Sequence, residues 1–291
     1  MRNFMMIVVC IAIVSHCSNE QSANLQTTEF RLIAYNVWYG FTKVPERKSD
    51  WLQWVQVQQP DIVSLQELNE YTPEQLQADA QRWGHDYSVL LKEDGFPTGV
   101  TSRYPIHDVQ RTLEGFHHGL LRVKIGEVYV YVIHLHPGNW EIRAQEMTHI
   151  LRDIESLPED ASILLAGDFN TFSVHDSIYY AHGELEPFFH NLDVQYDDKN
   201  LHDGQLDYSV LQRLEQAGFI DLEVLMRGKT YQFTGSFPTH IEKPGEHGSL
   251  RRLDYVFATP DLAERAVRAE IVADSITQVL SDHLPVIVDF E

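Results

Sequence analysis

Some polar residues that can bind metals or move protons directly follow apolar segments of this sequence. The apolar segment Ile163–Ala166 is followed by Gly167, and then by Asp168 and Asn170. Side chains alternate along an extended chain, so Asp168 and Asn170 point to the same side. A carboxylate that accepts a hydrogen bond beside an amide that donates one suits a water molecule next to a charged oxygen. This pair is therefore our first candidate for catalysis.

Other apolar segments end in the same way. Their ends carry Asn36, Glu67, His134, Asp254, Asp282 and His283. One such end is ordinarily a turn signal, because Asn and Asp favour turns. Its repetition along one chain indicates more, since ligand sites form where the ends of strands in layered sheets converge. We expect these residues to meet in one site.

The segments that carry these residues form an ordered set. They are YNVW, LQE, IHL, GDFN, RLDYVF and SDHLP, and they extend from about Phe30 to Phe290. In this order they resemble the motifs of the endonuclease/exonuclease/phosphatase superfamily, which includes deoxyribonucleases, abasic-site endonucleases, inositol-phosphate phosphatases and neutral sphingomyelinases. The resemblance implies a four-layered α/β sandwich, two packed mixed sheets flanked by helices, with the site at one edge of the sheets. It also implies a metal-dependent hydrolase of phosphate esters.

The oxygen-bearing residues of the set suit a hard cation. Mg²⁺ prefers one or two carboxylates together with water and substrate oxygens, and it offsets the charge that builds during phosphate ester hydrolysis. We take Glu67 as the first metal ligand, with Asn36 beside it and Asp282 as a further ligand. Mn²⁺ or Ca²⁺ would be substitutes for Mg²⁺.

The histidines of the set suit proton transfer. His283 can act as the base for water, and the family pattern pairs it with Asp254, which would hold its tautomer and stabilise its cation. A carboxylate buried in a strand rich in Tyr, Val and Phe would be costly without such a partner. The resemblance makes His134 a donor to a phosphoryl oxygen or an acid for the leaving group. Asp168 would orient the attacking water or help to deprotonate it, and Asn170 would donate a hydrogen bond to water or phosphate.

His134 and His136 lie two residues apart, which also fits a zinc-binding pair. The sequence has no HxHxDH or GNH segment that would continue a binuclear metallohydrolase pattern, so zinc is the weaker hypothesis. His136 is either a substrate-binding residue or a structural histidine. His118, in the segment GFHHGLLRV, is a further candidate for the wall of the pocket.

Arginine is the residue type that best matches the oxygens of a phosphate group. The candidates for a phosphate clamp are Arg103, Arg143, Arg251 and Arg252. We expect Arg103 and Arg143 to contact the substrate, while an ordinary surface position is the alternative for each.

Strands and helices alternate along the chain, which indicates a layered α/β architecture. We expect strands at 30–36, 61–67, 87–91, 99–103, 120–125, 127–135, 163–166, 250–259 and 284–290, and helices at 49–59, 73–83, 143–156 and 209–219. Residues 30–291 are predicted to form a single catalytic domain. A structured insertion, rich in histidine and aromatic residues, is expected at about 173–207.

The first 17 residues are typical of an export signal. Arg2 precedes an apolar run that is too short to span a bilayer comfortably. The segment VSHC resembles a lipoprotein cleavage box, although His16 stands where a small residue is usual, and Cys17 is therefore a candidate for lipidation. Residues 18–29 would form a short tether. We expect an exported protein, either a periplasmic or outer-membrane lipoprotein or a secreted enzyme.

The chain carries 43 acidic against 22 basic residues, a formal net charge of −21. Such a surface repels a polyphosphate backbone at long range, which disfavours a general nucleic-acid binder. We expect a monomeric phosphodiesterase that acts on a small or lipid-derived phosphate ester. A secreted nuclease for phosphate scavenging is the second hypothesis. A non-catalytic surface binding protein on the same fold is the alternative of another class.

Overall fold

The computed structural model describes residues 25, 28–228, 231–241, 243 and 245–291. The predicted export signal, Cys17 and most of the tether lie outside these residues, so they remain predictions. Across the described ranges, none of the helices has the length and apolar character needed to cross a membrane.

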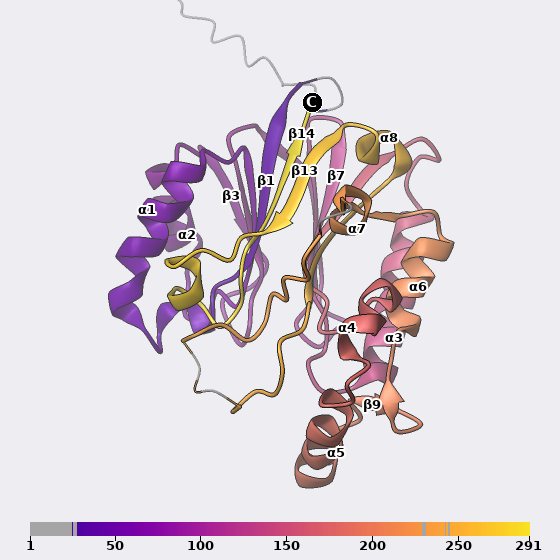
Figure 1. Ribbon diagram of the computed structural model, residues 1–291. Coiled ribbons are helices and arrows are strands. Elements are labelled where there is room, and N and C mark those ends of the chain that lie inside the picture. Colours follow the sequence, from indigo (N-terminus) through magenta and orange to yellow (C-terminus); the bar gives the residue numbers. More distant parts are fainter. Residues whose placement is uncertain (1–24, 26–27, 229–230, 242, 244) are drawn as a thin grey trace, which may run out of the picture.

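Two six-stranded mixed sheets form the centre of the fold (Figure 1). The first sheet has the order β13-β14-β1-β2-β4-β3, with β1 (Phe30–Asn36), β2 (Ile62–Gln66), β3 (Tyr87–Leu90), β4 (Gly99–Ser102), β13 (Ala266–Ile271) and β14 (Val286–Phe290). The second has the order β11-β12-β8-β7-β6-β5, with β5 (Ile106–Thr112), β6 (Leu120–Ile125), β7 (Val128–His134), β8 (Ser162–Asp168), β11 (Ile220–Asp221) and β12 (Asp254–Ala258).

Helices cover the outer face of each sheet. The first sheet is covered by α1 (Lys48–Gln58) and α2 (Pro73–Arg82), and the second by α3 (Trp140–Ile154) and α6 (Ser209–Gln216). The remaining helices and short strands are α4 (Ser177–Tyr180), α5 (Leu185–Tyr196), β9 (Leu201–His202), β10 (Gln205–Leu206), α7 (Leu222–Met226) and α8 (Pro260–Ala263). Single turns of 3₁₀ helix occur at η1 (Tyr39–Phe41), η2 (Pro45–Arg47), η3 (Val174–Asp176) and η4 (Thr277–Val279).

The central strands are buried on both faces, which explains their nearly continuous apolar sequence. In β1, Leu32 and Ala34 point into the core between the two sheets. Ile33 and Tyr35 point the other way and pack against the tryptophans of α1. Helix, sheet, sheet and helix therefore form four layers, and the predicted fold class is confirmed.

Strand direction brings the polar strand ends to one edge, the lower edge in Figure 1. Strands β1 and β2 run parallel, with Asn36 opposite Gln66. Strands β7 and β8 also run parallel, with His134 opposite Asp168, while the antiparallel β12 begins with Asp254 opposite Asp168. A row of three polar residues thus crosses the end of the second sheet.

The structure differs from the sequence prediction in several elements: β5, β13, α7 and α8 were not predicted, and α3 has a different start. Helix α3 begins at Trp140 rather than at residue 143, because the side chain of Asn139 caps it by accepting from the N–H groups of Glu141 and Ile142. Strand β5 was not predicted. It lies at the edge of its sheet and is largely exposed, so its sequence IHDVQRT lacks a buried face.

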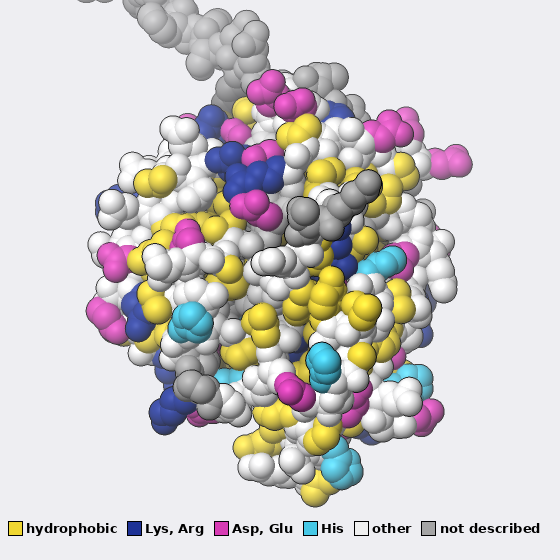
Figure 2. Space-filling view, viewed as in Figure 1, with side chains coloured by type: hydrophobic (Ala, Val, Ile, Leu, Met, Phe, Trp, Pro, Cys, Tyr) yellow, Lys and Arg dark blue, Asp and Glu magenta, His cyan; other side chains and the backbone are white. Residues whose placement is uncertain are grey.

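The segment at 173–207 is structured, as predicted. It contains α4, α5 and the β9–β10 hairpin, and its aromatic side chains form a small core with Phe237 and Leu253. Helix α5 projects below the rest of the molecule and carries the exposed side chains of Val194 and Tyr196 near its end (Figures 1 and 2). Phe189, nearer the start of the same helix, lines the site described next.

Candidate active site

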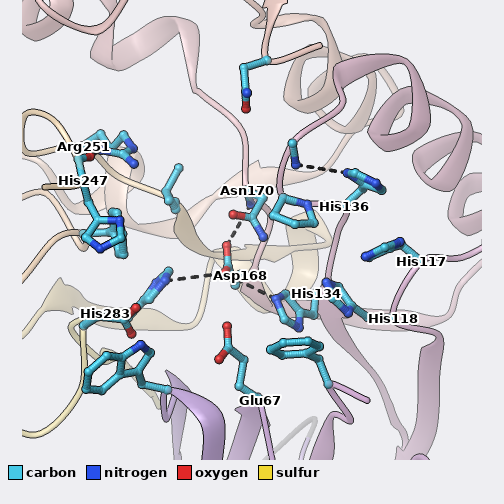
Figure 3. Close-up of a pocket in the computed structure, with 18 of the residues that line it drawn as sticks. Glu67, His117, His118, His134, His136, Asp168, Asn170, His247, Arg251 and His283 are labelled. Carbon is cyan, nitrogen blue, oxygen red and sulfur yellow. Dashed lines mark hydrogen bonds and ion pairs between the residues drawn. The ribbon is translucent and has the colours of Figure 1, made fainter. Parts of the chain in front are cut away.

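A cavity of about 450 Å³ lies at the edge where the polar strand ends meet. Both sheets line it, and so does the segment that contains α5. Figure 3 shows Glu67 on one side of the cavity, Asp168 and Asn170 at its centre, and histidines on two opposite walls. The predicted convergence of separate chain segments is therefore present in the structure.

Asp168 lies at the centre of the site and is buried. Its Oδ1 accepts a hydrogen bond from the backbone N–H of Asn170 (2.8 Å), and its Oδ2 accepts one from Nδ2 of Asn36 (3.2 Å). The Nε2 atoms of His134 and His283 each lie 3.7 Å from the same Oδ2. One carboxylate oxygen thus faces two imidazoles from opposite sides (Figure 3).

Gly167 allows this carboxylate to stand so close to the neighbouring strands. Its φ of +141° is one that side chains rarely adopt, and a Cβ atom there would lie 2.2 Å from the carbonyl oxygen of Ile133 and 2.6 Å from Nε2 of Gln66. No residue other than glycine fits this position. The glycine that ends the apolar segment therefore has a steric role in building the site.

His283 and Asp254 form a buried pair. Nδ1 of His283 lies 2.7 Å from Oδ2 of Asp254, as the family pattern implies. The Asp254 carboxylate accepts a hydrogen bond from Nδ1–H of His283, and Nε2 of the ring faces the pocket beside Asp168. The two chain segments that meet here are 29 residues apart.

Glu67 and Asn36 come from adjacent parallel strands of the first sheet. Glu67 is partly exposed to the cavity, with Oε2 accepting from the backbone N–H of Tyr39 (2.9 Å). Nδ2 of Asn36 donates to Oε1 of Glu67 and to Asp168, while its Oδ1 accepts from the N–H of Trp38. Asn36 therefore bridges two carboxylates as a donor. Its oxygen accepts one backbone hydrogen bond and keeps a second lone pair, so metal binding by Asn36 stays a prediction.

Burial and neighbouring charges shift the pKa values of this centre. Burial raises the pKa of the Asp168 carboxyl to about 7, even though His283 opposes the shift. Burial alone would lower the pKa of His283, but Asp254 and Asp168 outweigh it and raise that pKa to about 10. His134 is neutral, because burial and the nearby imidazoles hold its pKa well below the usual value.

Four histidines form one wall of the cavity: His117, His118, His134 and His136. The rings of His118 and His134 are stacked, with centroids 4.0 Å apart and planes at 11°. Burial lowers the pKa of His118 to about 3 and that of His136 to about 4, so this wall is uncharged.

The buried carboxylate of Glu146 holds this wall in place. Its two oxygens accept from the backbone N–H groups of His117 (2.8 Å) and His136 (2.9 Å), which belong to separate loops. Glu146 was not predicted. It lies on the buried face of α3, three residues after Arg143. Residues three apart in a helix share a face, so the predicted inward position of Arg143 was the available signal for Glu146.

The cavity contains oxygen and nitrogen donors that fit a divalent cation. Among the described residues, Asp168, Asp254 and His283 are the group whose ligand atoms all lie within 4.8 Å of one another. The side chains of Glu67 and Asp282 line the same cavity. This set of carboxylates beside a single lining arginine has the chemistry that Mg²⁺ prefers.

The expected arginine clamp is corrected in part. Arg103 lies outside the cavity and pairs with Asp61 (3.3 Å) at the opposite end of β2. Arg252 is fully buried in an ion-pair network with Asp176, Asp221 and Glu223, so it stabilises the fold. Arg251 does line the cavity.

Arg143 stands behind the cavity rather than in its wall. It is 1% exposed, and its Nη1 donates to the carbonyl oxygens of His136 (3.0 Å) and Pro137 (3.1 Å). Its first role is therefore to fix the turn that carries His136. Direct contact of Arg143 with a substrate in the main cavity, as predicted, is not supported by this position.

Several lining residues were missed by the sequence analysis. They include Trp38, Tyr39, Phe96, His117, Phe189, Phe237 and His247. The doublet His117-His118 was a signal for one of them, since adjacent histidines in a loop are unusual. Phe189 and His247 reach the site from segments outside the family motifs, so only tertiary structure could place them.

Solved structures with the same fold come from distant proteins. An AP endonuclease from Archaeoglobus fulgidus has a TM-score of 0.65 at 20% identity, over 90% of this chain and 99% of its own. A 3′ phosphatase from Neisseria bound to product DNA hairpin has a TM-score of 0.62 at 17% identity, with the same coverage. An endonuclease/exonuclease/phosphatase from Bacteroides vulgatus has a TM-score of 0.61 at 18% identity, over 91% of this chain and 99% of its own. At these identities the likeness shows the fold alone.

Among curated proteins, none matches this sequence significantly. The model of the Endonuclease/Exonuclease/phosphatase family matches residues 33–283, which include every polar strand end described above. The activities in the family name are hydrolyses of phosphate esters, in agreement with the carboxylate and histidine chemistry of the cavity. The chain therefore belongs to the endonuclease/exonuclease/phosphatase family.

Proposed function

We propose that this protein is a Mg²⁺-dependent phosphodiesterase in which the Asp254–His283 pair activates water beside Asp168. The observation that carries the proposal is the meeting of the 2.7 Å His283–Asp254 hydrogen bond with the buried Asp168 carboxylate in one cavity. A binding protein has no need of a buried imidazole held by one carboxylate and facing another, which makes the non-catalytic alternative weaker.

The residues have distinct roles in this proposal. Nε2 of His283 takes a proton from water in those molecules whose ring is neutral, a fraction that grows with pH because Asp254 and Asp168 raise the pKa of His283 to about 10. Asp254 stabilises the imidazolium that forms. The water oxygen bonds to phosphorus, the ester P–O bond breaks, and the leaving oxygen takes up a proton from bulk water. Asp168, fixed by Asn36 and the N–H of Asn170, accepts the second hydrogen of the water and so orients it.

Glu67 and Asp282 would hold the metal on the other side of the bound phosphate. Bound Mg²⁺ would offset the negative charge that builds on the phosphoryl oxygens. His134 donates a hydrogen bond to a phosphoryl oxygen in this proposal. Its pKa is held well below the usual value, so a neutral donor fits it better than a proton source for the leaving group.

A small phosphodiester fits the charge of the protein better than a long polyanion. The net charge is −21, and on the face shown in Figure 2 Lys and Arg side chains are scattered among acidic and hydrophobic ones. Long-range repulsion of a nucleic-acid backbone follows from that charge. Parallel assays with plasmid DNA, sphingomyelin and a phosphomonoester would rank these substrate classes.

The test is hydrolysis of bis(p-nitrophenyl) phosphate with and without Mg²⁺. We expect activity that EDTA abolishes, and a fall in kcat of about 10²–10⁴ in His283→Ala. Glu67→Gln should also lose activity, and higher Mg²⁺ should restore part of it. Glu127→Gln makes the same chemical change at an exposed position on the β6–β7 turn and should leave kcat unchanged. Turnover in EDTA, or full activity of both site variants, would refute the proposal.

A further inference from the structure

Two buried arginines near the site make no ion pair with any described carboxylate. Arg251 is 5% exposed and Arg143 is 1% exposed. Nη1 of Arg251 donates to the carbonyl oxygens of His247 and Ser249, and Nη1 of Arg143 donates to those of His136 and Pro137. The Nε atom of each guanidinium is buried without a hydrogen-bond partner.

Both arginines border one small recess. The recess has a volume of about 40 Å³, and six of its eight lining residues also line the main cavity, so it opens into that cavity. Arg143 and Phe172 are the two that line the recess alone. Its volume is enough for a few water molecules or one compact polar group.

Two buried guanidiniums without a carboxylate in direct contact are costly, even though Asp168 attracts both charges at longer range. Burial lowers the pKa of each guanidinium to about 10, which still leaves both charged at neutral pH. They lie in a protein whose overall charge would readily supply acidic partners. The rest of the fold does pair its buried arginine, since Arg252 contacts three carboxylates. Arg143 and Arg251 lack such a carboxylate contact, which points to an anion that binds at the recess from solution.

Aromatic rings hold Arg251 in its orientation. Its guanidinium carbon lies 4.6 Å from the ring centroid of Phe237 and 5.2 Å from that of Phe189. A guanidinium fixed in this way keeps its remaining N–H donors ready for a bidentate oxyanion contact, at little further loss of entropy.

We propose that this recess is a subsite for a second phosphate group of the substrate, bound by Arg251 and Arg143. A phosphate monoester carries close to two negative charges at neutral pH and so balances two guanidiniums, which a carboxylate does not. Asn170 lines both the recess and the main cavity, two residues from Asp168. The second phosphate therefore lies beyond Asn170, on the side of the scissile phosphate away from Glu67 (Figure 3).

The substrate class that follows is a phosphodiester that also bears a phosphomonoester. This part rests on the proposed function, because it assumes that a phosphate ester is hydrolysed beside Asp168. The binding of phosphate in the recess does not depend on turnover and can be tested separately.

The first experiment measures binding without metal. Inorganic phosphate is titrated into the full chain in EDTA by calorimetry. We expect saturable binding to the wild-type protein, at least about tenfold weaker in Arg251→Gln and weakened less in Arg251→Lys. Acetate, with one charge, should bind at least about tenfold more weakly than phosphate.

Matched variants make this experiment decisive. Arg103→Gln removes an arginine outside the cavity and should bind phosphate like the wild type. Glu67→Gln, which should lack turnover, should still bind phosphate in EDTA, so a failure of the hydrolase proposal does not hide the subsite. Thermal unfolding verifies that each variant is folded. Absence of wild-type binding, or equal binding by wild type and Arg251→Gln, would overturn the subsite.

The second experiment tests the substrate class with Mg²⁺ present. Thymidine 5′-(p-nitrophenyl phosphate) and its 3′-phosphorylated form differ by one phosphate, and their hydrolysis is followed by chromatography. We expect kcat/KM to be at least about tenfold higher for the doubly phosphorylated ester, and Arg251→Gln to reduce this ratio about tenfold. Equal kcat/KM values for the two esters in the wild type would overturn the substrate class.

Discussion

A single carboxylate, Asp168, organises the candidate site at the scale of residues. Its two oxygens receive donors from the side chain of Asn36 and the backbone of Asn170, and imidazoles face it from both sheets. These partners hold the Asp168 carboxylate in one position, so that it can orient a water molecule for proton transfer. The sequence already indicated part of this, because Asn36 and His134 end strands and Asn170 follows one closely.

The charge of Asp254 is the first residue-scale test. Asp254→Asn can still accept the Nδ1 proton of His283 but no longer stabilises the imidazolium, so we expect kcat to fall about 10²–10⁴ with little change in KM. Initial rates on bis(p-nitrophenyl) phosphate would measure this. The variant should be less stable than the wild type to urea at neutral pH, since it removes the carboxylate that raises the pKa of the buried His283. Unchanged kcat would mean that the pair is structural.

At the scale of elements, strand direction decides which polar residues reach the site. Asn36 and His134 end strands that run in parallel pairs with β2 and β8, so their positions follow from the alternation of strands and helices. Arg103 follows β4, which is antiparallel to β2, and therefore emerges at the opposite edge. The sequence shows that a strand is present but does not show its direction. That is why the prediction for Arg103 was wrong.

Packing between distant elements was the other limit of prediction. The fold class, the central strands and the polar strand ends could be predicted from the motifs, because all three depend on local sequence. The recess between Arg143 and Arg251 depends on how the 173–207 segment packs against the loop before β12. No periodicity or spacing along the chain specifies such contacts.

Gly167 gives a test at this scale. Gly167→Ala should lower the free energy of unfolding by about 4 kcal/mol or more, since the new Cβ would overlap the backbone of β7. Gly84→Ala is the matched control, because Gly84 also has a positive φ but has no atoms within 4 Å of the Cβ position. It should cost only about 1–2 kcal/mol from backbone strain. Chemical denaturation measures the free energy of unfolding of both variants. Similar losses in the two would contradict this prediction and show that the contact of residue 167 with β7 relaxes easily.

At the scale of the whole molecule, buried neutral histidines link stability to pH. His85, far from the candidate site, is the simplest case, since burial lowers its pKa to about 4. Its Nε2 lies 2.8 Å from the carbonyl oxygen of Pro60, which can only accept, so Nδ1 must accept from the hydroxyl of Thr101. Protonation of Nδ1 would break this second hydrogen bond. His118 and His136 are held neutral in the same way.

The folded protein should therefore lose stability as the pH falls below about 6.5. Between the unfolded pKa of about 6.5 and the folded pKa of about 4, the unfolded chain binds a proton at His85 that the folded chain does not. The stabilisation is complete above pH 6.5, and about 3 kcal/mol is lost by the time the pH reaches 4. The free energy of unfolding of the wild type and of His85→Gln is measured by urea denaturation in EDTA between pH 6.5 and pH 4. It should fall more steeply with decreasing pH in the wild type. Parallel plots of unfolding free energy against pH for the two proteins would contradict the role of His85.

The position of β14 has a consequence for how the protein is made. The last strand lies between β13 and β1, inside the first sheet, and His283 precedes it by three residues. A growing chain cannot complete that sheet until residues 286–290 have left the ribosome. A chain released before residue 283 therefore lacks both the imidazole of the candidate site and the strand that follows it.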